Sequence, residues 1–188
     1  TYNYMDSTPE RPVWTTSTLA RSTWSDSHIF GKPHATEYDS SATSDTTVGN
    51  TDGVTIYYEH ETGVNQIKAG SASAISASIE SGDFDISRTQ GGGADLRGDG
   101  DYMMKIRRVL PDFLQQTGDA RVTLNLKNYP TDSQASSSLG PFSSTTTTTK
   151  IDTRARARAI SLKVDNTSTG QHWKLGTFRL DIQADGRR

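Results

Sequence analysis

The feature that most constrains the fold is a long alternation of small or apolar with polar side chains late in the chain. Alanines at every second position from Ala155 to Ala159 alternate with arginines, and the pattern runs on into Ile160, Leu162 and Val164 against Ser161 and Lys163. A period of two residues places successive side chains on opposite faces of a β-strand and does not fit a helix. We therefore expect one long, half-buried strand over residues 154–164.

Further runs rich in β-branched, aromatic and aliphatic residues predict more strands. They cover residues 54–58, 74–79, 102–110, 121–126 and 173–182. The last run follows a turn-forming cluster and is expected to pair with residues 154–164 as a terminal hairpin. Only residues 111–116 resemble a helical turn. The sequence thus predicts an all-β fold of antiparallel sheets, a sandwich or a propeller-associated β domain, with long loops and very little helix.

Composition suggests how these strands are organised. Apolar residues make up 31% of the 188, so any core is thin or is completed by neighbouring chains. Residues 36–52 and 90–101 are polar and loop-like. We expect residues 1–50 to form the end of an upstream, propeller-like β array with a loop, and residues 51–188 to form a C-terminal β domain. Because the chain opens with Thr1, we also expect a longer protein to continue upstream.

Several classes of protein receive no support from composition. The net charge is −2, although acidic residues gather early and arginines late, so there is no bulk attraction to nucleic acid or membrane. No apolar run approaches the length of a membrane span, and we expect no membrane insertion by this chain. The absence of cysteine removes disulfides and thiolate metal sites and is compatible with folding in a reducing cytoplasm.

The candidate catalytic and metal-binding patterns are weak. Asp95, Asp99 and Asp101 fall in a glycine-rich loop that could offer oxygen ligands to calcium, but their spacing fails the EF-hand pattern and Asp-Gly pairs commonly form turns. In the run of residues 59–61 the two carboxylates face away from the imidazole of His60. No serine sits in a nucleophile elbow. We assign no catalytic residue, metal or cofactor, and expect a protein that is not an enzyme.

The arginine row is the sharpest local feature. In an extended strand, Arg154, Arg156 and Arg158 project from one face about 6.8 Å apart. Like charges in a row need acids, solvent or a polyanion nearby. We favour salt bridges to a neighbouring strand or subunit, with Asp152, Asp165 and Asp181 as partners across the expected hairpin. Contact with nucleic acid phosphates is the alternative.

Six segments occur in a fixed order: residues 58–63, 79–86, 98–104, 109–113, 173–179 and 185–188. Together with the arginine row they resemble the C-terminal region of the packaged-DNA stabilisation and tail nozzle proteins of short-tailed phages. The resemblance covers most of residues 55–188 and is strongest at the end. No segment is a catalytic signature, so specificity rests on their order.

The resemblance implies a structural virion protein of the phage tail, assembled in the host cytoplasm. Such a protein forms a six-fold ring with copies of itself, meets portal-adaptor and tail fibre or needle proteins, and transiently contacts the double-stranded genomic DNA that leaves through it. Phe113, Trp173 and Phe178 would then be core or interface anchors, and Arg179 would join the arginine row in an interface or facing DNA. Proteins of this family are usually longer, so this chain would be a C-terminal fragment or a reduced version.

Two alternatives remain open. The first is a carbohydrate-binding or host-recognition tail module, in which Trp14, Trp24 and Tyr57 would stack on sugar rings along a groove. The second is an adhesin domain stabilised by calcium at residues 95–101.

Overall fold

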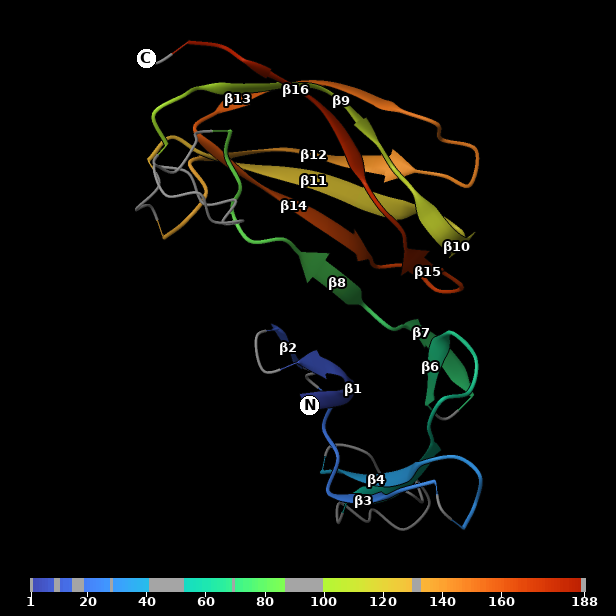
Figure 1. Cartoon of the computed structure of the whole chain (residues 1–188). Helices are drawn as coiled ribbons and strands as arrows, with labels where there is room; N and C mark the ends of the chain where they lie inside the picture. Colours follow the sequence, from blue (N-terminus) through green and yellow to red (C-terminus); the bar gives the residue numbers. More distant parts are fainter. Residues whose placement is uncertain are drawn as a thin grey trace. The chain divides into compact units, whose positions relative to one another are not determined.

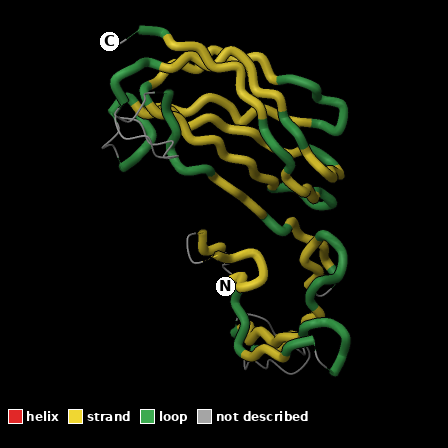
Figure 2. The backbone as a smooth tube through the Cα atoms, viewed as in Figure 1, coloured by secondary structure: helices red, strands yellow, loops and turns green. Residues whose placement is uncertain are grey.

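The computed structural model describes residues 2–8, 11–14, 19–27, 29–40, 53–68, 70–86, 100–129 and 133–186, with the backbone alone for residues 2–8 and 11–14. Every regular element in this part of the chain is a β-strand, and Figure 2 shows strands joined by loops and turns. The predicted all-β fold with antiparallel sheets and very little helix is confirmed. No helix of the described residues is long and apolar enough to cross a membrane.

The chain divides into two compact units, residues 1–63 and 64–188. In the first unit, two strands form one pair and three form an antiparallel sheet in the order β3-β4-β5. The strands are β1 (Tyr2–Thr8), β2 (Arg11–Trp14), β3 (Thr23–Ser25), β4 (His34–Asp39) and β5 (Val54–Glu59). β5 pairs with β4 over six residues, so the structure groups residues 54–59 with the first unit.

The second unit contains a sandwich of two sheets, ordered β12-β11-β14-β8 and β13-β9-β16, together with the pairs β6-β7 and β10-β15. Figure 1 shows the two larger sheets lying over one another. The strands before residue 118 are β6 (Asn65–Lys68), β7 (Ser71–Ala74), β8 (Ala77–Glu80), β9 (Met104–Leu110) and β10 (Phe113–Thr117). The later strands are β11 (Ala120–Lys127), β12 (Ser137–Ser144), β13 (Ile151–Ala157), β14 (Ala159–Asn166), β15 (His172–Leu175) and β16 (Arg179–Ala184).

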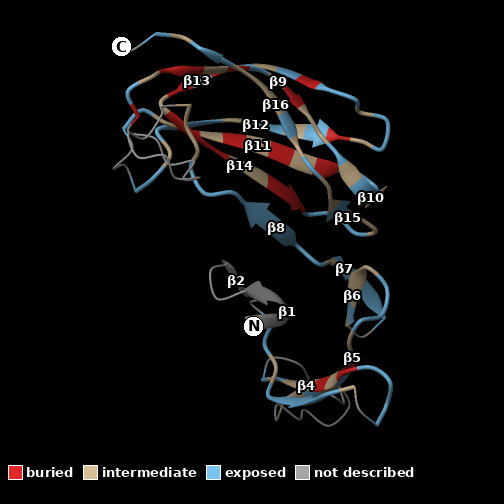
Figure 3. Ribbon diagram, viewed as in Figure 1, coloured by how far each residue is buried: buried red, intermediate tan, exposed pale blue. Residues whose placement is uncertain are grey.

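The hydrophobic core lies between these two sheets. Strand β11 is the clearest case, because Val122, Leu124 and Leu126 are buried while the residues between them are only partly covered, as the alternation predicts. Ile106 and Val109 of β9 face them from the other sheet with no exposed surface. Each large aliphatic side chain buried here contributes about 1.5–3 kcal/mol. Figure 3 shows the buried residues concentrated on β11, β14, β9 and β13.

The prediction of one strand over residues 154–164 is wrong. The alternation is real, but the chain turns at Arg158, so that β13 belongs to the three-stranded sheet and β14 to the four-stranded sheet. The corner coincides with a break in the period, because the apolar positions change from odd to even numbers between the adjacent buried residues Ala159 and Ile160.

The predicted terminal hairpin is also wrong. β14 pairs with β11 and β8, whereas β15 pairs with β10 and β16 pairs with β9. The predicted helical turn at residues 111–116 is largely strand β10. Its residues pair with β15, with a register shift between Phe113 and Gln115, because tertiary pairing overrides a weak local preference.

Candidate functional site

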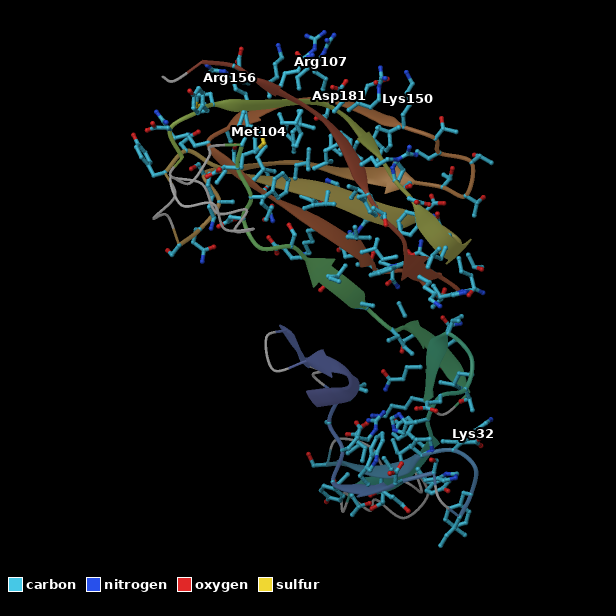
Figure 4. All side chains as sticks on the ribbon, viewed as in Figure 1. Lys32, Met104, Arg107, Lys150, Arg156 and Asp181 are labelled. Carbon is cyan, nitrogen blue, oxygen red and sulfur yellow. The ribbon has the colours of Figure 1, made fainter. Side chains whose placement is uncertain are left out.

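The outer face of the sheet β13-β9-β16 is the most strongly charged surface in the described part of the second unit. The inward side chains of this sheet enter the core, among them Met104, Ile106 and Ala155. The alternate side chains therefore project away from the sandwich. Figure 4 shows Arg107, Arg156, Lys150 and Asp181 on this side of the sheet, while Met104 points toward the interior.

We call this surface the cationic face and define it by its charged residues. Its basic side chains are Lys105, Arg107, Arg108, Lys150, Arg154, Arg156 and Arg179. Its acidic side chains are Asp152, Asp181 and Asp185. Basic groups thus outnumber acids seven to three, although the whole chain carries a net charge of −2.

Part of this positive charge is neutralised within the face. Asp152 accepts Arg108 Nε at 3.1 Å and Lys150 Nζ at 3.0 Å. These hydrogen bonds from Lys150 and then Arg108 hold the pKa of the Asp152 carboxyl below its usual value. Arg156 Nε donates to the carboxylate of Asp185 at 2.5 Å. All of these side chains are well exposed and solvent screens their charges, so the pairs add little to stability.

The remaining basic side chains are Lys105, Arg107, Arg154 and Arg179. None of them has a hydrogen-bonding or ion-pairing partner among the residues that the structure describes. Arg107 and Arg154 lie where the β9 pairings change register, next to each other across the two strands. A β-bulge leaves such residues outside the regular ladder and re-aims their side chains. Two basic residues on neighbouring strands therefore lie at the same irregularity in the middle of the cationic face.

Arg158 does not continue the row of Arg154 and Arg156. It lies at the corner between β13 and β14, and its Nη1 donates to the backbone carbonyls of Gly100 at 2.6 Å and Asp101 at 3.3 Å. The expected salt-bridge partners are also redistributed. Asp165 pairs with Arg121 in the four-stranded sheet, and Asp152 pairs with Arg108 and Lys150 rather than with the arginine row. Arg158 is thus a structural group that fastens the segment entering β9.

Phe113, Trp173 and Phe178 form one aromatic cluster beside the core. The Phe113 ring lies 6.4 Å from Trp173 and 5.5 Å from Phe178, both in edge-on geometry. All three are half-buried and pack against the hydrophobic core. The Trp173 indole N–H donates to the side-chain oxygen of buried Asn166 at 3.2 Å. These contacts give the three residues a packing role within one chain.

The aromatics named for sugar binding are separated by the sheet of the first unit. Trp24 and Tyr57 are 58% and 62% exposed. Trp24 is in register with Ala35 and Tyr58, while Tyr57 is in register with Thr36, so their side chains project from opposite faces. They cannot line one groove. The side chain of Trp14 lies outside the described residues.

Tyr57 instead belongs to a second aromatic group on its own face. Its ring stacks on His34 at 5.2 Å, its hydroxyl hydrogen-bonds His34 Nδ1, and Phe30 meets His34 edge-on at 4.9 Å. Phe30 is 63% exposed. This group is an exposed aromatic surface that sequence reasoning found only through Tyr57.

The opposite face of that sheet holds a polar cluster that sequence reasoning missed. Arg21 lies over the Tyr58 ring at 4.0 Å, pairs with Glu37 at 2.9 Å, and donates from Nε to His60 Nε2 at 3.2 Å. Burial, and then the positive charge of Arg21, lowers the pKa of His60. The side chains of Arg21 and Glu37 retain 10% and 17% of their exposure. No spacing rule signals this cluster, because its members lie far apart in sequence.

No group of three or more histidine or acidic side chains is positioned to hold a metal ion within the described ranges. Of the candidate calcium loop, Asp95 and Asp99 lie outside those ranges. Glu59, next to His60, is engaged by Lys32 at 2.8 Å, and that hydrogen bond lowers the Glu59 pKa.

Comparison with known proteins adds no relative. No model of a protein family matches the chain, and no curated protein matches it.

Proposed function

We propose that this chain is a non-enzymatic structural subunit of a phage tail, forming part of the ring through which DNA leaves and by which packaged DNA is retained. The proposal rests on the ordered resemblance along residues 55–188. It is compatible with the all-β second unit, whose sheets offer edges for pairing with neighbouring subunits. Its place would be the virion tail, below the portal-adaptor proteins and beside the tail fibre or needle proteins.

The observation that carries the assembly role is the open edge of β8. This strand pairs with β14 on one side, and no described strand pairs with its other side. All four of its residues are exposed, as Figure 3 shows, and Ile79 is 48% exposed although it lies in register with the buried Val164. An exposed strand edge with an apolar side chain invites pairing with another chain, and a closed ring hides such edges.

Imaging of tails from particles whose genome encodes this chain tests the assignment directly. A six-fold ring coaxial with the portal supports the proposal, whereas a trimeric spike overturns it.

The role of the edge is tested with Ile79→Lys, which places a charge on β8 and should prevent ring assembly without unfolding the monomer. Ile67→Lys is the matched control, because Ile67 is 63% exposed on β6 and lies outside this edge. Mass photometry that finds equal assembly for both variants contradicts the role of β8.

The second candidate function is carbohydrate binding by the first unit, and the exposed group of Phe30, His34 and Tyr57 favours it. Aromatic rings exposed on a sheet face suit stacking against sugar rings. A glycan array with the full chain and with Tyr57→Ala tests this function. Binding that is lost in Tyr57→Ala and kept in Trp24→Ala would support the Tyr57 face, while an array without binding would remove this candidate.

A further inference from the structure

We infer that the cationic face binds the phosphate backbone of double-stranded DNA without reading its sequence. This inference deepens the proposed function, on which it rests, by assigning the DNA contact to particular side chains. The residues that carry it are Lys105, Arg107, Arg154 and Arg179, the basic groups of this face that have no partner among the described residues. Arg156 and Arg158 are already engaged by Asp185 and by backbone carbonyls.

The charges favour a polyanion. Arg107 and Arg154 lie side by side at the change of register, and their repulsion is relieved when an anion with several charges lies across both. Successive charges on one DNA strand are only about 3.4 Å apart along the helix axis, so basic side chains at irregular spacing on the face can each meet a phosphate. Arginine and lysine side chains on a sheet surface can follow such a backbone while contacting no base.

The composition of the face favours a duplex over a single strand. Proteins that hold single-stranded nucleic acid stack its bases on aromatic side chains. The outward residues of β9, β13 and β16 include none: besides the charged groups, the paired outward positions hold Leu110 and Gln183. A face with charges but no stacking platform can contact phosphates and has no means of binding unstacked bases.

A second copy of the chain is the competing occupant, because residues 1–63 contain nine acidic and three basic side chains. The acids described in that unit are mostly engaged, however. Glu37 pairs with Arg21, Glu59 pairs with Lys32, and Asp39 also has an interaction partner. Asp26 accepts a hydrogen bond from the Ser27 backbone N–H. The described part of the first unit therefore lacks a row of free carboxylates to match the cationic face.

Binding of the full chain to a fluorescent 30-base-pair duplex of random sequence tests the inference, measured by anisotropy across a salt series. Neutralising about four phosphates predicts a slope near −3.6 for the logarithm of the binding constant against that of salt. The double variant Arg107→Gln, Arg154→Gln should flatten this slope by about two and weaken binding roughly 10- to 60-fold at 0.1 M salt.

The matched control is Lys163→Gln, Lys174→Gln, which removes two positive charges from β14 and β15, outside the cationic face. It should keep the wild-type slope and affinity. Equal losses in the two double variants would show that net charge alone drives binding and would overturn the inference. Tighter binding to a single strand of the same length would also overturn it.

A third outcome identifies the competing occupant. If the chain binds no duplex but self-associates in a salt-dependent way that Arg107→Gln, Arg154→Gln abolishes, the face docks on a second copy and the inference is wrong. Because the assay uses the isolated chain, its result does not depend on ring formation. If the chain binds duplex DNA but is absent from tail rings, the inference of a DNA-binding face stands and the proposed nozzle role is wrong.

Discussion

The second unit buries twelve hydrophobic side chains in one cluster between its sheets, whereas only Pro33, Ala35 and Tyr58 are buried among the described side chains of the first unit. The first unit instead gathers Arg21, Glu37, Tyr58 and His60 on one sheet face. Two sheets in one chain are thus stabilised by different forces, apolar burial in one and a partly desolvated ionic and aromatic cluster in the other. The two units should therefore respond differently to mutation, salt and pH.

The largest expected effect is in the second unit. Leu124→Ala removes a side chain with no exposed surface and leaves a cavity between the sheets, which should cost about 2–5 kcal/mol of stability. Urea unfolding followed by circular dichroism measures this loss. Leu114→Ala is the control, since Leu114 is 70% exposed and its removal should change stability by about 0.5 kcal/mol at most. Similar losses in the two variants would contradict the sandwich core.

An intermediate effect is expected in the first unit. Arg21→Ala removes the ion pair with Glu37 and the cation over the Tyr58 ring, at a cost of about 1–3 kcal/mol. Hydrogen exchange should accelerate in β4 and β5 while β11 is unchanged. Lys32→Ala is the control, because the Lys32 and Glu59 side chains are each nearly half exposed, so solvent screens their pair and its loss should leave hydrogen exchange in β4 and β5 nearly unchanged. If hydrogen exchange in Arg21→Ala accelerates equally in β4, β5 and β11, the two units are not stabilised by separate forces.

The smallest effect is a pH dependence of the first unit. The folded state lowers the pKa of His60, so the unfolded chain binds its proton more readily. Stability is complete above the ordinary histidine value of about 6.5 and declines as the pH falls below it. The charged groups that act on His60 are Arg21, Glu61 and His34.

His60→Gln should remove this pH dependence while keeping a side-chain acceptor for Arg21. Hydrogen exchange of β4 at pH 7 and pH 5, compared between wild type and variant, measures the difference. An equal decline in both would assign the pH dependence to another group.

Half-buried strands were the easiest part of the fold to predict. Val122, Leu124 and Leu126 face the core as their alternation indicates, and β5 covers the predicted residues 54–58. Pairing was not predictable in the same way, because it depends on contacts between segments far apart in sequence. The corner at Arg158 is marked only by a one-residue shift of the apolar positions between Ala159 and Ile160, and the prediction of one strand ran across that shift.

The cationic face was predicted only in part for the same reason. Arg154, Arg156 and Arg179 are visible as charged residues in predicted strands. Lys105 and Arg107 lie on the same surface only because β9 lies between β13 and β16, and no local sequence pattern indicates that strand order. The register change that brings Arg107 beside Arg154 also leaves no signature in the sequence.

The corner at Arg158 has a consequence for how the second unit comes apart. One residue links β13 to β14, so a single short stretch of backbone belongs to both layers of the sandwich. Neither layer can slide past the other or peel away without pulling the next strand out of its opposite sheet. The two layers are thus mechanically coupled, and a load applied to one is shared by the other.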